Sequence, residues 1–210
     1  MKTAWLSAFL IILIWSGIDP KDYLTWALEV SPAIIGSIIL LATYKSFRLT
    51  TLLYTLILLH CIVLMVGGHY TYAEVPLFEY LKPVLGFERN NYDKVGHFVQ
   101  GFVPALIARE ILIRKNVVTS AKWRNFFIVC FCLALSAFYE LIEWAVAIVS
   151  GASAEAFLGT QGYIWDTQSD MALALTGAIS ALVLLARMHD RQIRHITSAT
   201  TRPPSVVSPD

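Results

Sequence analysis

The chain has 210 residues, of which 57% are hydrophobic and 15% are charged, and its mean hydropathy is +0.62. These values exclude an ordinary soluble domain and indicate a membrane protein. The formal net charge is only +1, and no basic segment interleaved with aromatic residues suggests a nucleic-acid partner. We therefore expect an all-α, polytopic membrane protein whose main partner is the lipid bilayer.

Six apolar runs each approach the roughly 20 residues that a helix needs to cross a bilayer. The first follows Lys2 and resembles a secretory signal, but no small-x-small cleavage site comes after it, so we interpret it as an uncleaved helix. Residues 1–190 are predicted to form a single domain of six transmembrane helices, and 191–210 a disordered cytoplasmic tail rich in Pro, Ser and Thr. The runs are approximately 4–18, 23–44, 49–67, 95–113, 126–149 and 171–188.

The basic residues predict how this domain is oriented. With the N-terminus in the cytoplasm, twelve of the 16 Lys and Arg residues lie inside, and only Lys21, Lys82, Arg89 and Lys94 lie outside. This bias follows the positive-inside rule and places both termini in the cytoplasm. All three cysteines fall within predicted helices, so we expect no disulfide framework.

Two long loops are predicted on the outer side. The first, 68–92, is broken by Pro76, Pro83 and Gly86 and has enough aromatic residues to lie in the membrane interface. The second, 150–170, contains no Lys or Arg, and its apolar residues suggest a segment folded back toward the headgroups.

Polar side chains gather at one depth of the predicted bundle. The stretch "NYDKVGHFVQGF" at 91–102 opens the fourth helix from the outside and has polar residues at i, i+4 and i+7 on one face. The fifth helix climbs about 1.5 Å per residue, which brings two glutamates at i and i+3 into its outer half. The sixth helix begins beside two aspartates. The residues so assembled are Asp93, His97, Gln100, Glu140, Glu143, Asp166 and Asp170.

A charged side chain at bilayer depth costs about 2.5 to 3.5 kcal/mol, so these groups should face the bundle interior. One histidine with several carboxylates suits a divalent metal ion with mainly oxygen ligands. The alternative without metal makes the histidine a general base beside a protonated glutamate. The catalytic candidates are His97, Glu140, Glu143 and Asp170; the substrate-binding candidates are Asp93, Lys94, Gln100 and Gln168; and the metal-ligand candidates are His97, Glu140, Glu143, Asp166 and Asp170.

Structural interpretations of several polar residues stay open. Asp93 and Asp166 could be helix N-caps, and His97 a hydrogen-bonded core histidine. His60 is interpreted as an interhelical hydrogen-bonder, and Arg109 as a snorkelling arginine with Glu110 as its local partner.

The blocks "NYDKVGHFVQGF", "FYELIEWAVA" and "GTQGYIWDTQSDMALALTGA" together resemble the YjdF family of bacterial inner-membrane proteins, over about residues 5–190. This resemblance implies a multi-pass protein of the bacterial inner membrane and implies little about activity.

A more distant likeness is to VanZ-like membrane proteins, which are linked to glycopeptide resistance. The order Asp93-Lys94, His97-Phe98, a glutamate in a later helix and then Asp170 is similar to their pattern. The chain departs from it at Ala174, where those proteins tend to carry Asn, and in lacking a basic residue before the last helix. The likeness therefore implies where a site lies and not which reaction it performs.

Three functions remain in competition. The leading hypothesis is an outward-facing pocket that binds or processes an amphiphile, such as a lipid or a polyprenyl-linked head group, by hydrolysis or group transfer if it is an enzyme. The second is a proton- or cation-coupled transporter, and the third a non-enzymatic membrane assembly factor. The sequence predicts no particular oligomeric state.

Overall fold

The computed structural model describes residues 2–150 and 164–200, and these residues form helices without any strand. All six predicted runs are helical, which confirms the all-α fold class. The helices are α1 (Lys2–Ser16), α2 (Tyr23–Thr43), α3 (Thr51–Tyr70), α4 (Pro76–Leu85), α5 (Tyr92–Arg114), α6 (Ala121–Ser150) and α8 (Asp166–Thr200).

Five helices, α2, α3, α5, α6 and α8, are long and apolar enough to cross a membrane. The remaining predicted span, α1, has 15 residues, which at 1.5 Å per residue gives about 22 Å against a hydrocarbon core of about 30 Å. The chain is therefore a polytopic membrane protein in which the first helix is the shortest of the predicted spans.

The structure differs from the prediction in the segment 68–92, which contains the helix α4 instead of an irregular loop. Of the three residues that we interpreted as breakers, Pro76 and Gly86 are its start and stop signals, and Pro83 lies within the helix. Pro76 occupies the first turn, where its missing N–H is harmless, and Gly86 caps the end with φ of 69°. The exposed Leu77, Tyr80 and Val84 of α4 are consistent with the predicted interfacial position.

The tail prediction is wrong for residues 191–200, because α8 continues to Thr200. Its arginines at 187, 191 and 194 keep the last turns polar, as suits a helix that leaves the bilayer. Residues 201–210 lie outside the described part of the chain, as do residues 151–163, which make up most of the loop predicted at 150–170.

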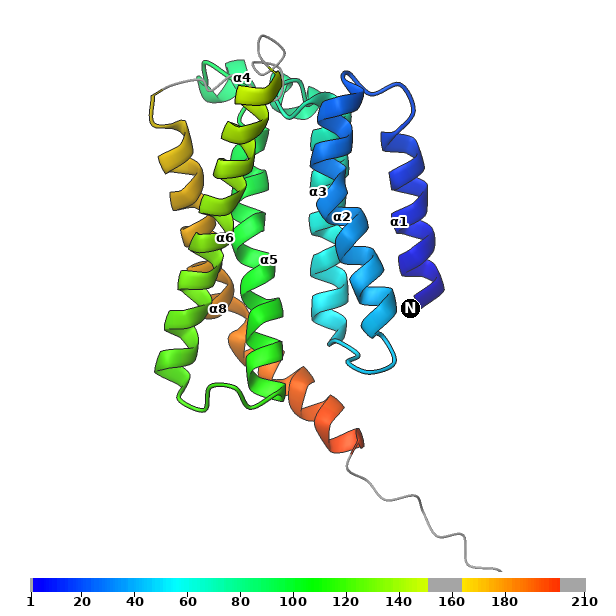
Figure 1. The fold of residues 1–210 in the computed structure, drawn as a ribbon, viewed down its shortest axis with the longest axis vertical. Helices are drawn as coiled ribbons and strands as arrows, with labels where there is room; N and C mark the ends of the chain where they lie inside the picture. Colours follow the sequence, from blue (N-terminus) through cyan, green and yellow to red (C-terminus); the bar gives the residue numbers. More distant parts are fainter. Residues whose placement is uncertain (1, 151–163, 201–210) are drawn as a thin grey trace, which may run out of the picture.

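The helices form two groups of three, α1–α3 and α5, α6 and α8, and α4 lies across one end of the bundle (Figure 1). Helix α3 packs against α5 and joins the two groups, while α2 packs on α3 and α6 packs on α5 and α8. We call the end with α4 the α4 end. The opposite end, where α5 finishes and α6 begins, we call the basic end.

Helices α5 and α8 approach closely because small residues lie at their crossing. A Cβ atom on Gly101 would overlap the backbone of Ala174, and one on Gly177 would overlap the backbone of Phe98. Ala178 and Ala181 are fully buried on the same helix. The small residues of α8 therefore allow close packing.

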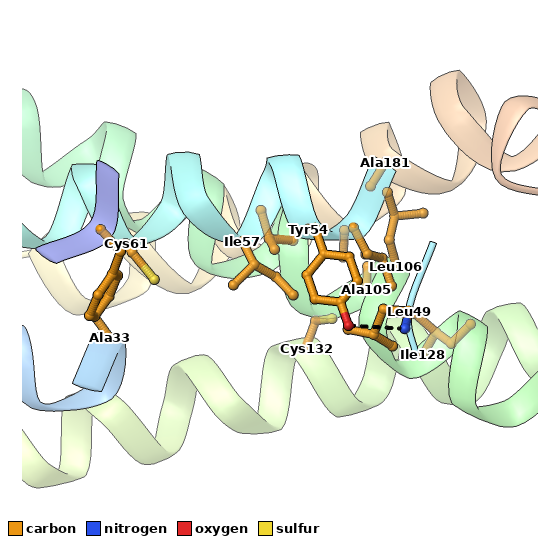
Figure 2. Packing of buried hydrophobic residues seen from close by; sticks show 14 of the residues in the cluster. Ala33, Leu49, Tyr54, Ile57, Cys61, Ala105, Leu106, Ile128, Cys132 and Ala181 are labelled. Carbon is orange, nitrogen blue, oxygen red and sulfur yellow. Dashed lines mark hydrogen bonds between the residues drawn. The ribbon is translucent and has the colours of Figure 1, made fainter. Parts of the chain in front are cut away.

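Apolar side chains from both groups meet around α3 (Figure 2). Ile57 and Leu53 of α3 are buried with Leu106 of α5 and Ile128 of α6. The Tyr54 hydroxyl accepts a hydrogen bond from the backbone N–H of Leu49 at 3.4 Å, which satisfies its oxygen inside the core. The apolar contacts of Leu53, Leu106 and Ile128 hold the two groups together.

Candidate functional site

A cavity of about 1060 Å³ lies between the two groups of helices, with residues of α2, α3, α5, α6 and α8 in its wall. Its two parts differ in chemistry. Toward the α4 end is a part that we call the polar chamber, lined by Glu29, Tyr72, Asn90, Asp93, His97, Gln100, Tyr139, Glu140, Glu143, Asp166, Thr167 and Asp170. The part that continues toward the basic end we call the apolar groove, lined by residues such as Ile35, Gly36, Ile39, Ile57, Leu64, Val103, Ile107, Ile111, Phe127, Phe131, Leu135 and Phe138.

Three side chains from three helices meet in the polar chamber. His97 of α5 lies between Glu140 of α6 and Asp170 of α8, with 3.9 Å from Nδ1 to Glu140 Oε1 and 3.9 Å from Nε2 to Asp170 Oδ2. Gln100, one turn along α5, places its Oε1 3.1 Å from His97 Nδ1. The predicted gathering of α5, α6 and α8 side chains at one depth is therefore present in the structure.

Two carboxylate oxygens in this group are buried without a hydrogen-bond partner among the described residues. They are Oε1 of Glu140 and Oδ1 of Asp170, whose side chains are only 8% and 7% exposed. Buried polar atoms are nearly always satisfied in folded proteins, so an orphaned carboxylate oxygen indicates a missing proton, water, ion or ligand.

Arg89 neutralises a second pair of carboxylates at the α4 end. It lies 2.5 Å from Asp166 and 3.2 Å from Asp93, which it joins across the chamber. Burial disfavours the charged guanidinium, but the hydrogen bond to Asp166 and the charges of both aspartates raise the pKa of Arg89 above its ordinary value. Asp93 and Asp166 are therefore held by an ion pair, and their role goes beyond the N-cap that we left open.

A further carboxylate, that of Glu29, lies across the chamber on α2. Glu29 is buried in the middle of an apolar helix and accepts a hydrogen bond from the Tyr139 hydroxyl at 2.9 Å. The Tyr72 side chain also contacts Glu29, and burial raises the pKa of the Tyr72 hydroxyl well above its ordinary value, so that it stays a donor. The Glu29–Tyr139 bond connects the two groups of helices at the level of His97.

The predicted site residues divide into those inside and those outside the chamber. His97, Glu140 and Asp170 form its centre, while Asp93, Gln100, Glu143 and Asp166 line its wall. Lys94 and Gln168 do not line the cavity, and Gln168 lies on the exposed face of α8. The first turns of α5 and α8 each present one face to the chamber, and these two residues lie on other faces.

Sequence reasoning missed several uncharged residues of the chamber and two charged residues, Glu29 in its wall and Arg89 at its edge. Glu29 carries the same signal as Glu140, a carboxylate inside a transmembrane run, and that signal could have identified it. Arg89 lies in the segment before α5 and carries no such signal, because its partners depend on how α4 folds back over the bundle.

Two structural interpretations are overturned outside the chamber. Arg109 does not snorkel; it is buried and pairs with Asp190 of α8 at 2.7 Å. Glu110 binds His189 at 2.8 Å as well as Arg114 at 2.7 Å. The two pairs with α8 could not be read from spacing along one helix.

His60 has no hydrogen-bond partner within the described ranges, so the predicted interhelical bond is absent there. Its side chain lines the cavity instead.

Comparison with known proteins agrees with the membrane architecture. The model of the family described as "Predicted membrane protein (DUF2238)" matches residues 1–191. The chain belongs to this family. It is also 56% identical over 184 residues to the inner membrane protein YjdF of Escherichia coli strain K12, which covers 88% of each chain. No solved structure matches at a significant level.

The DUF2238 match covers every helix that lines the cavity and ends within α8. The resemblance to the YjdF family is thereby confirmed, and the chain is a multi-pass inner-membrane protein. The likeness to VanZ-like proteins stays a prediction that rests on short motifs.

Proposed function

We propose that this DUF2238 protein binds an amphiphile, such as a lipid or a polyprenyl-linked compound, with its head group in the polar chamber and its hydrocarbon chain in the apolar groove. The observation that carries this proposal is the continuity of the two parts within one cavity. Ligand sites are typically apolar clefts with a few convergent polar groups. Here the carboxylates gather at one end, which is the distribution of polarity in an amphiphile.

The length of the groove supports a long hydrocarbon chain. From His97 to Ile111, both of which line the cavity, α5 advances 14 residues, or about 21 Å at 1.5 Å per residue. One leaflet of a hydrocarbon core of about 30 Å is about 15 Å deep. A chain in the groove would therefore extend beyond the middle of the bilayer.

The rim of the groove offers a route from the bilayer. Ile39 of α2 is 55% exposed and Phe131 of α6 is 49% exposed, although both also line the cavity. Side chains that line a cavity and reach the surface mark its edge, and here that edge lies within two membrane-spanning helices. An amphiphile could enter sideways between α2 and α6 without crossing water.

Both rival functions fit the cavity less well. A cation path needs polar groups along its course, and His60 is the one titratable side chain that lines the groove within the described ranges, apart from the thiol of Cys61. A purely structural polar core should satisfy its own groups, whereas Glu140 and Asp170 each keep an orphaned oxygen.

The proposal can be tested by filling the groove. Gly36 lines the cavity, and a Cβ added to it meets no atom within 4 Å, so Gly36→Leu should fit without a clash. Ala27→Leu adds a similar side chain to an exposed position of α2 outside the cavity and is the matched control. Native mass spectrometry of protein purified in mild detergent should show retained lipid in the wild type and in Ala27→Leu.

Gly36→Leu should lose most of the retained lipid while its melting temperature stays at or above that of the wild type. Equal retention in all three proteins, or none in the wild type after incubation with an inner-membrane lipid extract, would contradict the proposal.

A further inference from the structure

The centre of the polar chamber has the donor atoms of a metal site. One ring nitrogen of His97, one oxygen of Glu140 and one oxygen of Asp170 all lie within 4.8 Å of one another. They come from α5, α6 and α8, so the bundle itself holds them together. Such convergence from separate elements is typical of metal sites in helical bundles.

The spacing of these donors leaves room for an ion. His97 Nδ1 lies 3.9 Å from Glu140 and His97 Nε2 lies 3.9 Å from Asp170, and both separations are too long for a hydrogen bond. Two donors at about 2.1 Å from one ion lie no more than about 4.2 Å apart. The Nε2–Asp170 separation falls within that range. One ring nitrogen and one oxygen of each carboxylate lie within 4.8 Å of one another, so a small side-chain shift would bring all three within reach of one ion.

Gln100 can fix the tautomer of His97 that a metal ligand needs. Its side-chain oxygen lies 3.1 Å from His97 Nδ1 and can accept the proton of that nitrogen. The lone pair is then on Nε2, which faces Asp170. A partner that fixes the tautomer of a histidine through its other nitrogen is the usual support of a metal ligand.

The charges around the chamber also favour a cation. Six carboxylates line the cavity, and within the described ranges no Lys or Arg side chain lines it. Arg89 lies at the edge and binds Asp93 and Asp166. Glu140 and Asp170 are more than nine-tenths buried by side chain, and each keeps an oxygen without a partner among the described residues. An ion bound between them would satisfy both atoms and offset two buried charges.

We propose that His97, Glu140 and Asp170 bind one divalent metal ion in the polar chamber. One imidazole and two carboxylates suit Mn²⁺, and Zn²⁺ or Mg²⁺ to a lesser degree, with water or a ligand completing the coordination. The site goes beyond the proposed binding of an amphiphile and does not depend on it. It would also let an acidic chamber hold an anionic head group, such as a phosphate, through the ion.

The test is metal binding by the full chain purified in mild detergent. After chelation and desalting, titration with Mn²⁺ should give one equivalent per chain by calorimetry and by mass spectrometry of metal content. His97→Gln, Glu140→Gln and Asp170→Asn should each weaken binding about 100-fold or more, since even residues that only support a ligand cost 10- to 100-fold. Glu74→Gln, at an exposed ion pair with Lys21 outside the cavity, should bind as the wild type does.

A second measurement does not depend on how the variants fold. Electron-spin-echo spectroscopy of the Mn²⁺ complex should detect one nitrogen ligand in the wild type, and the signal should change when the histidines are labelled with ¹⁵N. The inference is wrong if the wild type binds no stoichiometric Mn²⁺, Zn²⁺ or Mg²⁺, or if the ion has no nitrogen ligand. Lipid retained without metal would overturn this inference alone, whereas metal bound without lipid would overturn only the proposed function.

Discussion

The guanidinium of Arg89 lies 2.5 Å from the Asp166 carboxylate and joins the segment before α5 to the first turn of α8. The same guanidinium lies 3.2 Å from Asp93, so one side chain joins both aspartates at the α4 end of the chamber. Neither aspartate can then turn away from the cavity without breaking a charged hydrogen bond.

Replacing this arginine should loosen the α4 end. Hydrogen bonds to charged groups contribute about 1.5 to 3 kcal/mol each, so Arg89→Gln should lower the free energy of unfolding by about that amount. Arg89→Lys should restore little of it, because one ammonium does not reproduce the fork that reaches two carboxylates. Denaturant unfolding in micelles measures the effect.

The matched control for Arg89 is Lys82→Gln, which removes the exposed ion pair with Glu79 and should cost less than about 1 kcal/mol. Equal losses in the two variants would show that the Arg89 pairs contribute no more than an ordinary surface pair.

The close crossing of α5 and α8 predicts that alanine destabilises the protein at Gly101 but not at Gly36. In Gly101→Ala the new Cβ would overlap the backbone of Ala174, and backbone cannot yield as a side-chain tip can. Overpacking of this kind costs about 1 to 3 kcal/mol. Gly36→Ala has open space and should instead stabilise α2 by up to about 1 kcal/mol through helix propensity. Thermal unfolding of the two variants beside the wild type should show shifts of opposite sign.

Glu110 and its partners form a buried network at the basic end, and this network should contribute more to the free energy of unfolding than any surface pair. Glu110 is fully buried and binds the Thr50 hydroxyl at 2.8 Å and His189 at 2.8 Å. Glu110→Gln leaves its partners poorly matched, and breaking a buried ion pair costs about 3 to 5 kcal/mol. Glu74→Gln, at the exposed pair with Lys21, should cost less than about 1 kcal/mol. Chemical unfolding that gives the same loss for both glutamines would contradict the network's role.

The N-cap of α2 predicts a pH-dependent contribution to stability. The Asp22 carboxylate accepts a hydrogen bond from the backbone N–H of Thr25 at 2.6 Å, which lowers the pKa of Asp22 below its ordinary value. A group with a lowered pKa stabilises the fold above its unfolded pKa of about 4, and this stability is lost as the pH falls through the folded pKa.

Asp22→Ala should therefore cost about 1 kcal/mol at pH 7 and progressively less below about pH 4. Asp22→Asn keeps a good cap and should show little of this pH dependence. The melting temperatures of the three proteins should be measured between pH 3 and pH 7. If Asp22→Ala lowers the melting temperature by the same amount over this whole range, the carboxylate is not the cap.

Hydropathy predicted the transmembrane helices because lipid cannot satisfy a free backbone, so every span must be an apolar helix. It did not predict α4, whose ten residues include two prolines. The depth of each side chain in the membrane was also predictable, because the rise per residue of a helix is fixed. That depth predicted that His97, Glu140 and Asp170 lie at the same level.

The rotation of each helix was not predictable from depth alone. Lys94 and Gln168 lie at the level of the chamber but on faces of α5 and α8 that do not line it. Contacts between helices that are distant in the sequence could not be predicted either. Glu110 meets His189 across the bundle, and no spacing within α5 indicates that partner.

The most direct test of the central claim is photo-crosslinking with two lipid probes that differ only in the position of a diazirine, at the head group or at the end of the chain. We predict that the head-group probe labels peptides around His97 and Glu140, whereas the chain-end probe labels residues near Ile111 or Phe127. Excess unlabelled lipid should compete with both, and Gly36→Leu should remove the chain-end labelling. Labelling by both probes spread over the exposed faces of the helices, without competition, would contradict the account.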